Sequence, residues 1–232
     1  MKNRIRTSRA VFFIFILIIQ FVLLFSVYSA AGDSSKTTSG FSTYELPDGD
    51  QEKIERNIDL KPVSQMNASF EVECFDVSDS DQLALGLRSG TNKYIFVFDK
   101  DGQFDCGYSF KCYGTFRLDW DKENILVYLV RGNYEISIDD QGIISEVRKI
   151  EDTPGNDAYW REIMKTKARI VGEKEYLLEN NKIIVKTKDA ETVVYDASNV
   201  IVLRNVFIAV IVVLVVVVVL YSAMRFIKKN KK

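Results

Sequence analysis

The sequence of 232 residues contains no histidine. This absence excludes catalytic triads and metal sites that depend on an imidazole, and it removes the usual sensor of near-neutral pH. Three motifs are also missing: a glycine-rich phosphate loop, a nucleophile elbow and the signature set of a protein kinase. No cofactor is therefore expected, and no pair of carboxylates stands out as a catalytic centre.

Acidic residues are missing from both ends of the chain. Residues 1–31 hold four basic residues and residues 205–232 hold five, whereas residues 32–204 hold all 32 acidic residues and 22 basic ones. The middle of the chain therefore carries a formal charge of −10. We expect no nucleic-acid partner, because phosphate neutralisation needs a basic surface and each basic cluster here adjoins an apolar run.

The first apolar run, residues 11–27, follows the four basic residues and is interrupted only by Gln20 and Ser26. Residues 1–31 are either a cleaved signal peptide or an uncleaved signal anchor, and the length of the run favours the anchor. Both alternatives export everything that follows. The choice decides only whether the mature protein has one span or two.

The second apolar run, residues 206–224, holds no charged residue and no Gly, Pro, Asn or Gln. It predicts a transmembrane helix, and the five basic residues of the tail at 225–232 place the C-terminus in the cytoplasm. No ionisable residue lies at membrane depth, so we interpret the helix as an anchor. The lipid bilayer is thus the first expected partner, with residues 32–204 extracytoplasmic at the cell membrane.

Residues 32–66 are polar and predict a flexible leader with one or two helical turns near residues 51–58. The last expected strand, residues 192–195, ends about ten residues before the span. Residues 200–224 are therefore expected to comprise a tether followed by the transmembrane helix. An extended tether of about ten residues reaches at most about 35 Å. The exported domain is therefore expected to lie close to the bilayer.

Residues 67–199 predict an antiparallel β domain, because short β-branched and aromatic runs alternate with turn residues every eight to twelve positions. In residues 69–75, alternation places Cys74 on the buried face and Glu73 on the solvent face. Residues 104–112 and 116–120 alternate in the same way. Residues 94–98 and 125–130 are apolar on both faces and predict central strands.

A break at Pro154-Gly155 interrupts the strands. Residues 156–164 then predict a short helix, capped by Asn156 or Asp157, because aromatic and aliphatic residues recur there at helical spacing. We expect its apolar stripe to pack onto the sheet, and a partner-binding surface is the alternative.

An internal repeat connects three segments: residues 92–104, 132–144 and 181–193 align without gaps at offsets of 40 and 49 residues. The first two contain the turns DKDG and DDQG, and the third has Glu191 in place of the turn glycine. This strand–turn–strand unit resembles the blade repeats of β-propellers. The resemblance implies a mainly β fold: an antiparallel meander of about three propeller-blade-like four-stranded units with one short helix, flanked by membrane helices. Because closed propellers take four or more blades, exposed blade edges or a completing partner are expected.

The exported location makes the three cysteines candidates for oxidation. If the strand between Cys106 and Cys112 is continuous, their Cα atoms lie about 20 Å apart, well beyond the limit of about 7 Å for a disulfide. A bond between them therefore requires a turn at Gly107. We favour the alternative in which all three cysteines are small buried side chains and form no disulfide.

The first repeat gathers carboxylates at Asp99, Asp101 and Asp105, and calcium prefers six to eight oxygen ligands. An Asp-Gly pair between two apolar strands is also what a tight hairpin requires, since the turn needs positive φ. We favour the turn interpretation and expect no metal.

Two functional hypotheses follow. The first is a membrane-anchored, non-catalytic binding or accessory module that recognises an envelope protein or glycan. The alternative is a membrane-tethered glycan hydrolase that uses paired carboxylates, since acidic residues abound. The sequence assigns neither a catalytic nor a binding residue.

Overall fold

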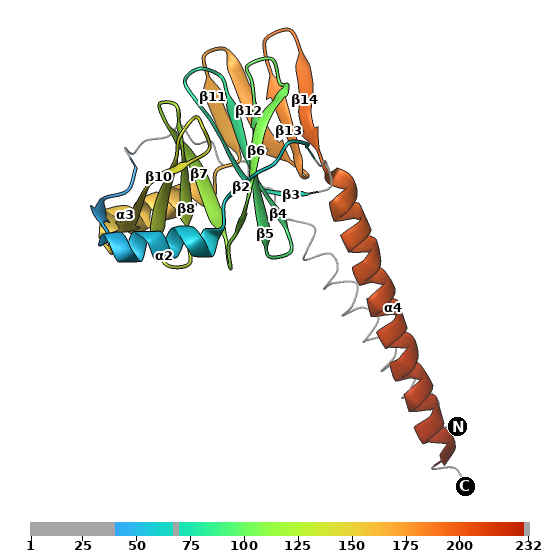
Figure 1. Ribbon diagram of the computed structural model, residues 1–232. Coiled ribbons are helices and arrows are strands. Elements are labelled where there is room, and N and C mark those ends of the chain that lie inside the picture. Colours follow the sequence, from blue (N-terminus) through green and yellow to red (C-terminus); the bar gives the residue numbers. More distant parts are fainter. Residues whose placement is uncertain (1–39, 67–69, 230–232) are drawn as a thin grey trace. The chain divides into compact units, whose positions relative to one another are not determined.

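The computed structural model describes residues 40–66 and 70–229. The predicted signal segment, residues 1–31, lies outside this range, as does the end of the basic tail. The described residues form a mainly β protein with three antiparallel sheets and few helices (Figure 1).

Each sheet contains four strands that are consecutive in the sequence. The first sheet holds β3 (Glu71–Val77), β4 (Leu83–Ser89), β5 (Asn92–Phe98) and β6 (Phe104–Lys111), with the short β2 (Lys61–Pro62) added beside β6. The second sheet holds β7 (Phe116–Asp121), β8 (Asn124–Leu129), β9 (Tyr134–Ile138) and β10 (Ile144–Ile150), with β1 (Thr43–Glu45) beside β10. The third sheet holds β11 (Ala168–Val171), β12 (Lys174–Glu179), β13 (Lys182–Lys186) and β14 (Glu191–Asp196).

The first sheet packs against both of the others. On one face, Ile95 and Phe110 belong to the same buried cluster as Val127 of the second sheet. On the other face, Phe96 shares a cluster with Tyr176 of the third sheet. A sheet covered on both faces needs strands that are apolar on both sides, which explains why residues 94–98 read as a continuous apolar run.

The helical turns predicted near residues 51–58 are present as the helix α2 (Asp48–Ile58), but the prediction of a flexible leader is wrong for residues 40–62, because β1 and β2 flank this helix. The side chain of Ile58 is buried at 4% exposure in the core between the first two sheets. Leu46, Ile54 and Leu60 pack against the same core. The apolar residues of this segment are too few to show a pattern, but nearly all of them are used.

The helix α3 (Pro154–Ile163) matches the predicted short helix and packs on the far face of the second sheet, where Tyr159 and Ile163 are buried with Tyr128. The predicted cap is wrong, however. Thr153 caps the helix, and its side chain accepts a hydrogen bond from the backbone N–H of Asn156. Pro154 suits the first helical position, because it has no N–H to satisfy, so the cap precedes it.

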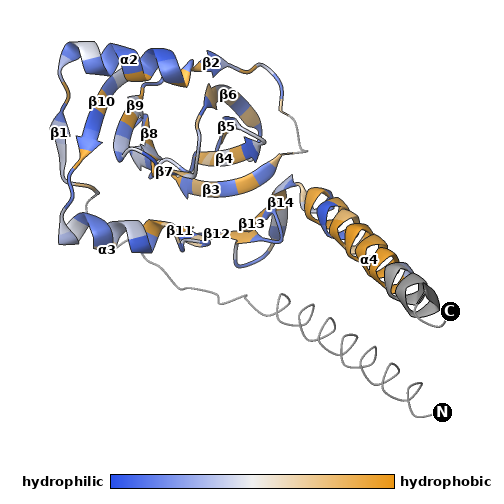
Figure 2. Cartoon of the chain, turned by 90° about the horizontal axis from the view of Figure 1, so that it is seen from below, coloured by the Kyte–Doolittle hydropathy of each residue, from blue (hydrophilic) through white to orange (hydrophobic). Residues whose placement is uncertain are grey.

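The helix α4 (Ser198–Lys229) begins two residues after β14, so the expected extended tether does not exist. The Asp196 carboxylate accepts hydrogen bonds from the backbone N–H and the hydroxyl of Ser198 and starts the helix directly at the sheet. Within the described residues, one helical stretch, Ser198–Tyr221, is long and apolar enough to cross a membrane. Figure 2 shows this helix as mostly hydrophobic, in contrast to the mixed colouring of the strands.

A β-bulge in β3 reverses the predicted orientation of Glu73. The register with β4 shifts between Val72 and Cys74, and Glu73 turns into the interface with the second sheet instead of toward solvent. Its carboxylate accepts hydrogen bonds from the Lys93 ammonium at 2.7 Å and from the backbone N–H of Phe116 at 3.0 Å. The Lys93 and Glu73 side chains are only 6% and 7% exposed, so this ion pair is buried.

Asp76 joins all three sheets. It lies on β3 at 3% exposure and accepts a hydrogen bond from Arg169 of β11 at 2.5 Å. It also accepts one from the backbone N–H of Trp120 on β7 at 3.2 Å. A buried carboxylate is tolerated only with such partners, so the three sheets are held in one arrangement around it.

We predict that the substitution Arg169→Met lowers the free energy of unfolding by about 3–5 kcal/mol, because it removes the positive charge that balances a buried carboxylate. The measurement is denaturant unfolding of the full chain in detergent micelles, followed by tryptophan fluorescence. The double variant D76N/R169M should lose less than the sum of the single losses. As a control, Lys188→Met breaks an ion pair whose side chains are 77% and 79% exposed, and should change stability little. An equal effect of R169M and K188M would contradict the role of Asp76.

Candidate functional site

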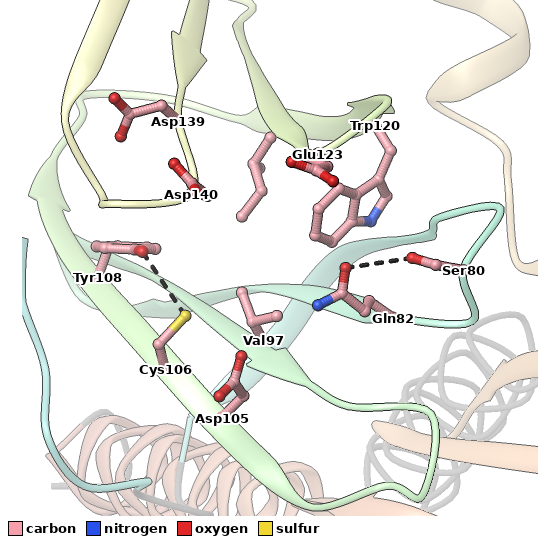
Figure 3. Close-up of a pocket in the computed structure, with 11 residues that line it drawn as sticks. Ser80, Gln82, Val97, Asp105, Cys106, Tyr108, Trp120, Glu123, Asp139 and Asp140 are labelled. Carbon is pink, nitrogen blue, oxygen red and sulfur yellow. Dashed lines mark hydrogen bonds between the residues drawn. The ribbon is translucent and has the colours of Figure 1, made fainter.

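An acidic cleft lies between the first and second sheets and has a volume of about 350 Å³. Hairpin ends and strand ends surround it (Figure 3). Its lining residues are Ser80, Gln82, Val97, Asp105, Cys106, Tyr108, Trp120, Glu123, Ile125, Asp139 and Asp140.

The lining carboxylates come from separate parts of the chain. Asp105 lies near the start of β6, Glu123 lies in the turn between β7 and β8, and Asp139 and Asp140 lie in the turn between β9 and β10. Among the described residues, no lysine or arginine lines the cleft. Four carboxylates on a concave surface focus a negative potential, so the cleft suits a cationic ligand.

Two aromatic side chains complete the cleft. Tyr108 is buried at 7% exposure, and Trp120 is half-buried, with its indole N–H directed to the backbone carbonyl of Asp76 at 3.4 Å. The network around Asp76 therefore also fixes one wall of the cleft. An aromatic face beside carboxylates is suited to holding an ammonium or guanidinium group.

The turns of the first two repeats have the same hydrogen bonds. The Asp99 carboxylate accepts from the backbone N–H groups of Asp101 and Gln103, both at 2.9 Å. Asp139 accepts in the same way from the N–H groups two and four residues later. The turn glycines adopt φ angles of +77° and +78°. These aspartates thus shape hairpins, as the turn interpretation expects.

Gly142 has a second role in the turn between β9 and β10. A Cβ atom at this position would lie 2.3 Å from the Tyr108 ring, so only glycine lets the turn rest against the first sheet. This close approach carries Asp139 and Asp140 to the edge of the cleft. The third repeat has a shorter turn, in which Thr187 N–H donates to the Ala190 carbonyl and Glu191 already belongs to β14. It therefore needs no glycine at position 191.

The three calcium candidates are not brought together. Asp99 and Asp101 line a cavity between the first and third sheets, whereas Asp105 lines the acidic cleft. Asp101 pairs with the neighbouring Lys100 at 2.8 Å. In residues 40–66 and 70–229, no group of three or more His, Cys, Asp or Glu side chains is arranged to hold a metal ion.

All three cysteines are free thiols. The disulfide between Cys106 and Cys112, one of the two alternatives drawn from the sequence, is therefore not formed. β6 runs without a turn from Phe104 to Lys111, which keeps the two residues apart. Burial raises the pKa of Cys74 to about 12 and also raises the pKa values of Cys106 and Cys112. At neutral pH these side chains are thiols rather than thiolates, so they are poor nucleophiles.

A second polar cavity lies on the outer face of the second sheet and was not found from the sequence. It has a volume of about 610 Å³, and its lining includes Asp121, Glu135, Glu146 and Arg148. Burial raises the pKa of Glu135 to about 7; the charge of Arg148 opposes this shift, and the nearby carboxylates add to it. The alternation of residues 134–138 could have placed Glu135 on this face of the sheet. It could not have predicted that the side chain is partly buried.

No protein-family model and no curated protein matches the sequence. Two solved structures of virginiamycin B lyase from Staphylococcus aureus are similar to part of the chain: a catalytically inactive form with quinupristin and a selenomethionine-substituted form. Each is 14% identical with a TM-score of 0.28, over 58% of this chain and 44% of the lyase chain. At this level the likeness has no bearing on the activity of the present chain.

We predict that Glu135 makes stability depend on pH near neutrality. Its pKa in the folded state, about 7, lies above its ordinary value of 4.5. The stability linked to the neutral carboxyl is therefore fully present below about pH 4.5 and is lost as the pH rises through 7. Thermal unfolding of the full chain at pH 5, 6, 7 and 8 should show a smaller fall for Glu135→Gln than for the wild type. Glu52→Gln, on an exposed position of α2, serves as the control. Identical pH profiles for wild type and E135Q would refute this assignment.

Proposed function

We propose that the protein is a non-catalytic binding module, anchored to the cell membrane by α4, whose acidic cleft holds a cationic segment of a partner protein at the cell envelope. One observation carries this proposal: four carboxylates and two aromatic rings surround a cavity of about 350 Å³, and no basic side chain of the described part of the chain lines it. A lysine or arginine side chain matches this combination of charge and ring faces.

The distribution of charge supports the orientation of the module. Basic residues flank both apolar runs on the sides that face the ends of the chain, and the −10 charge lies between the runs. By the positive-inside rule, both ends are cytoplasmic and the β domain is extracytoplasmic. The acidic cleft then faces partners of the envelope.

The blade-like organisation is part of the same proposal. The repeated segments coincide with the third strand, the turn and the start of the fourth strand in each sheet: β5 with β6, β9 with β10, and β13 with β14. On this proposal, each sheet corresponds to one propeller-blade-like unit, and the cleft lies between two such units. Ligand sites between packed sheets suit a binding role.

We predict that removing three carboxylates weakens binding of a cationic peptide. The variant D105N/E123Q/D140N leaves Asp139 in place, because its carboxylate shapes the turn. A fluorescent oligo-arginine peptide should bind the full chain in micelles at least about tenfold more tightly than the variant, since each charge-assisted contact contributes about 1.5 kcal/mol or more. Fluorescence anisotropy at two salt concentrations measures this difference.

A charge-matched variant provides the control. E52Q/D157N/E191Q removes three exposed carboxylates away from the cleft. If this control weakens binding as much as the cleft variant does, peptide binding depends only on the net charge of the domain, and the cleft is not the binding site. Crosslinking in intact cells followed by mass spectrometry then tests the natural partner, and recovery of the chain with no partner would count against a binding module.

Glycan hydrolysis is the second candidate, and the cavity around Glu135 favours it. A glycosidase needs one carboxylic acid that stays protonated near neutrality and a second carboxylate nearby. Glu135 meets the first requirement, and Glu146 and Asp121 line the same cavity. Incubation of the full chain with chitooligosaccharides or cell-wall glycan should then release reducing ends, and Glu135→Gln should abolish the release. No release by the wild type removes this candidate.

A further inference from the structure

Two arginines, one on α4 and one on β4, bind the same carboxylate near the start of α4. Arg204 of α4 contacts both carboxylate oxygens of Glu71 at 3.0 and 3.1 Å. Arg88, near the end of β4, contacts the same carboxylate at 2.9 and 3.2 Å. One carboxylate thus holds two guanidinium groups, which leaves a net charge of +1 on a domain that is otherwise acidic.

Both guanidinium groups remain accessible, since the Arg88 and Arg204 side chains are 47% and 48% exposed. They have donors that Glu71 does not occupy, because a guanidinium carries five N–H groups. The geometry of these donors matches a phosphate as well as a carboxylate.

The position of Arg204 along α4 determines the depth of the two arginines relative to a bilayer. Arg204 is followed by Asn205 and then by the uncharged run that begins at residue 206. Two residues of helix correspond to about 3 Å, so Arg204 lies at the boundary where a hydrocarbon core would begin. Since Arg88 shares its carboxylate, the turn at the end of β4 lies beside the same boundary.

A cavity adjoins the pair. It has a volume of about 370 Å³ and is lined by Glu71, Arg88, Ser89, Gly90 and Val200. Ser89 and Gly90 are exposed, and apart from Gly90 and its two chain neighbours, no atom of the described residues lies within 4 Å of the place where a Cβ of Gly90 would be. This side of the cavity is therefore open to a group that approaches along the helix.

We propose that Arg88 and Arg204, with the turn at Ser89 and Gly90, bind the phosphate of an anionic phospholipid next to α4. This headgroup site rests on the part of the proposed function that makes α4 a membrane anchor, but not on the acidic cleft. The acidic domain repels an anionic surface elsewhere, so the local positive charge also orients the domain on the membrane.

The test uses the full chain in nanodiscs that contain equal amounts of phosphatidylglycerol and phosphatidylcholine. Native mass spectrometry gives the ratio of the two lipids retained on the protein. The wild type should be enriched in phosphatidylglycerol by about fivefold for each guanidinium group involved. The variant R88Q/R204Q should retain the two lipids in their bulk ratio, whereas Arg131→Gln, which removes an exposed arginine from the loop after β8, should behave like the wild type.

The variant Glu71→Gln separates lipid binding from a purely structural role. It removes the negative charge but keeps both arginines, so enrichment should persist or increase. If E71Q loses the enrichment as R88Q/R204Q does, the arginines only hold Glu71 and the headgroup site is wrong. Free phosphate is tested by adding inorganic phosphate to discs of phosphatidylcholine alone and measuring hydrogen exchange in the β4–β5 turn. If free phosphate protects this turn and the mixed discs show no lipid enrichment, the lipid assignment is also overturned. Failure of the chain to enter the discs at all would instead refute the anchor.

Discussion

The carboxylate of Asp76 is the group on which the arrangement of the three sheets depends. It lies on β3 and takes hydrogen bonds from β7 and from β11, so each sheet contributes to its surroundings. Two further buried groups act nearby. The Glu73–Lys93 pair faces the joint between the first two sheets, and Asp119 of β7 accepts from the hydroxyls of Tyr128 on β8 and Tyr159 on α3, which ties the helix to the second sheet. Such groups contribute little net stability compared with apolar replacements, but they penalise any other packing of the sheets. The apolar clusters supply the driving force, and the buried charges select the arrangement.

The sequence predicts the strands well because side-chain alternation is a local property. Apolar and alternating runs, helical spacing and the internal repeat predicted the strands, the short helix and the repeated hairpins, respectively. They did not predict the equivalent β-bulges at Asp105 and Ser145, forty residues apart. The errors fall where a tertiary contact overrides the local pattern. A bulge turns Glu73 inward, and a segment with few apolar residues still packs against the core through Ile58. The acidic cleft could not be assembled in advance, because its carboxylates come from turns whose proximity depends on how the first two sheets pack.

The absence of histidine does not leave the domain without a group that titrates near neutrality. Glu135 takes this role because it is half-buried on a face that also carries Glu146 and Asp121, and a raised pKa follows from that burial and that charge. Composition alone excludes imidazole chemistry, but it does not exclude pH dependence, since the surroundings of a side chain decide its pKa. The same domain therefore offers two unlike acidic surfaces: an open cleft of several carboxylates, and a cavity around one carboxyl that is easily neutralised.

The pairing of β1 with β10 sets an order for events during folding. Thr43 lies opposite Ile150, so the two partners are more than a hundred positions apart, and β2 must likewise wait for β6. Long-range pairs of this kind form late, because the intervening chain has to be ordered before the contact repays its entropy cost. As the chain is synthesised, β2 therefore stays unpaired until β6 is made, and β1 stays unpaired until β10 is made. The segment that carries β1 and β2 is thus made before its partners and docks after them, and it covers one edge of each of two sheets with a short strand.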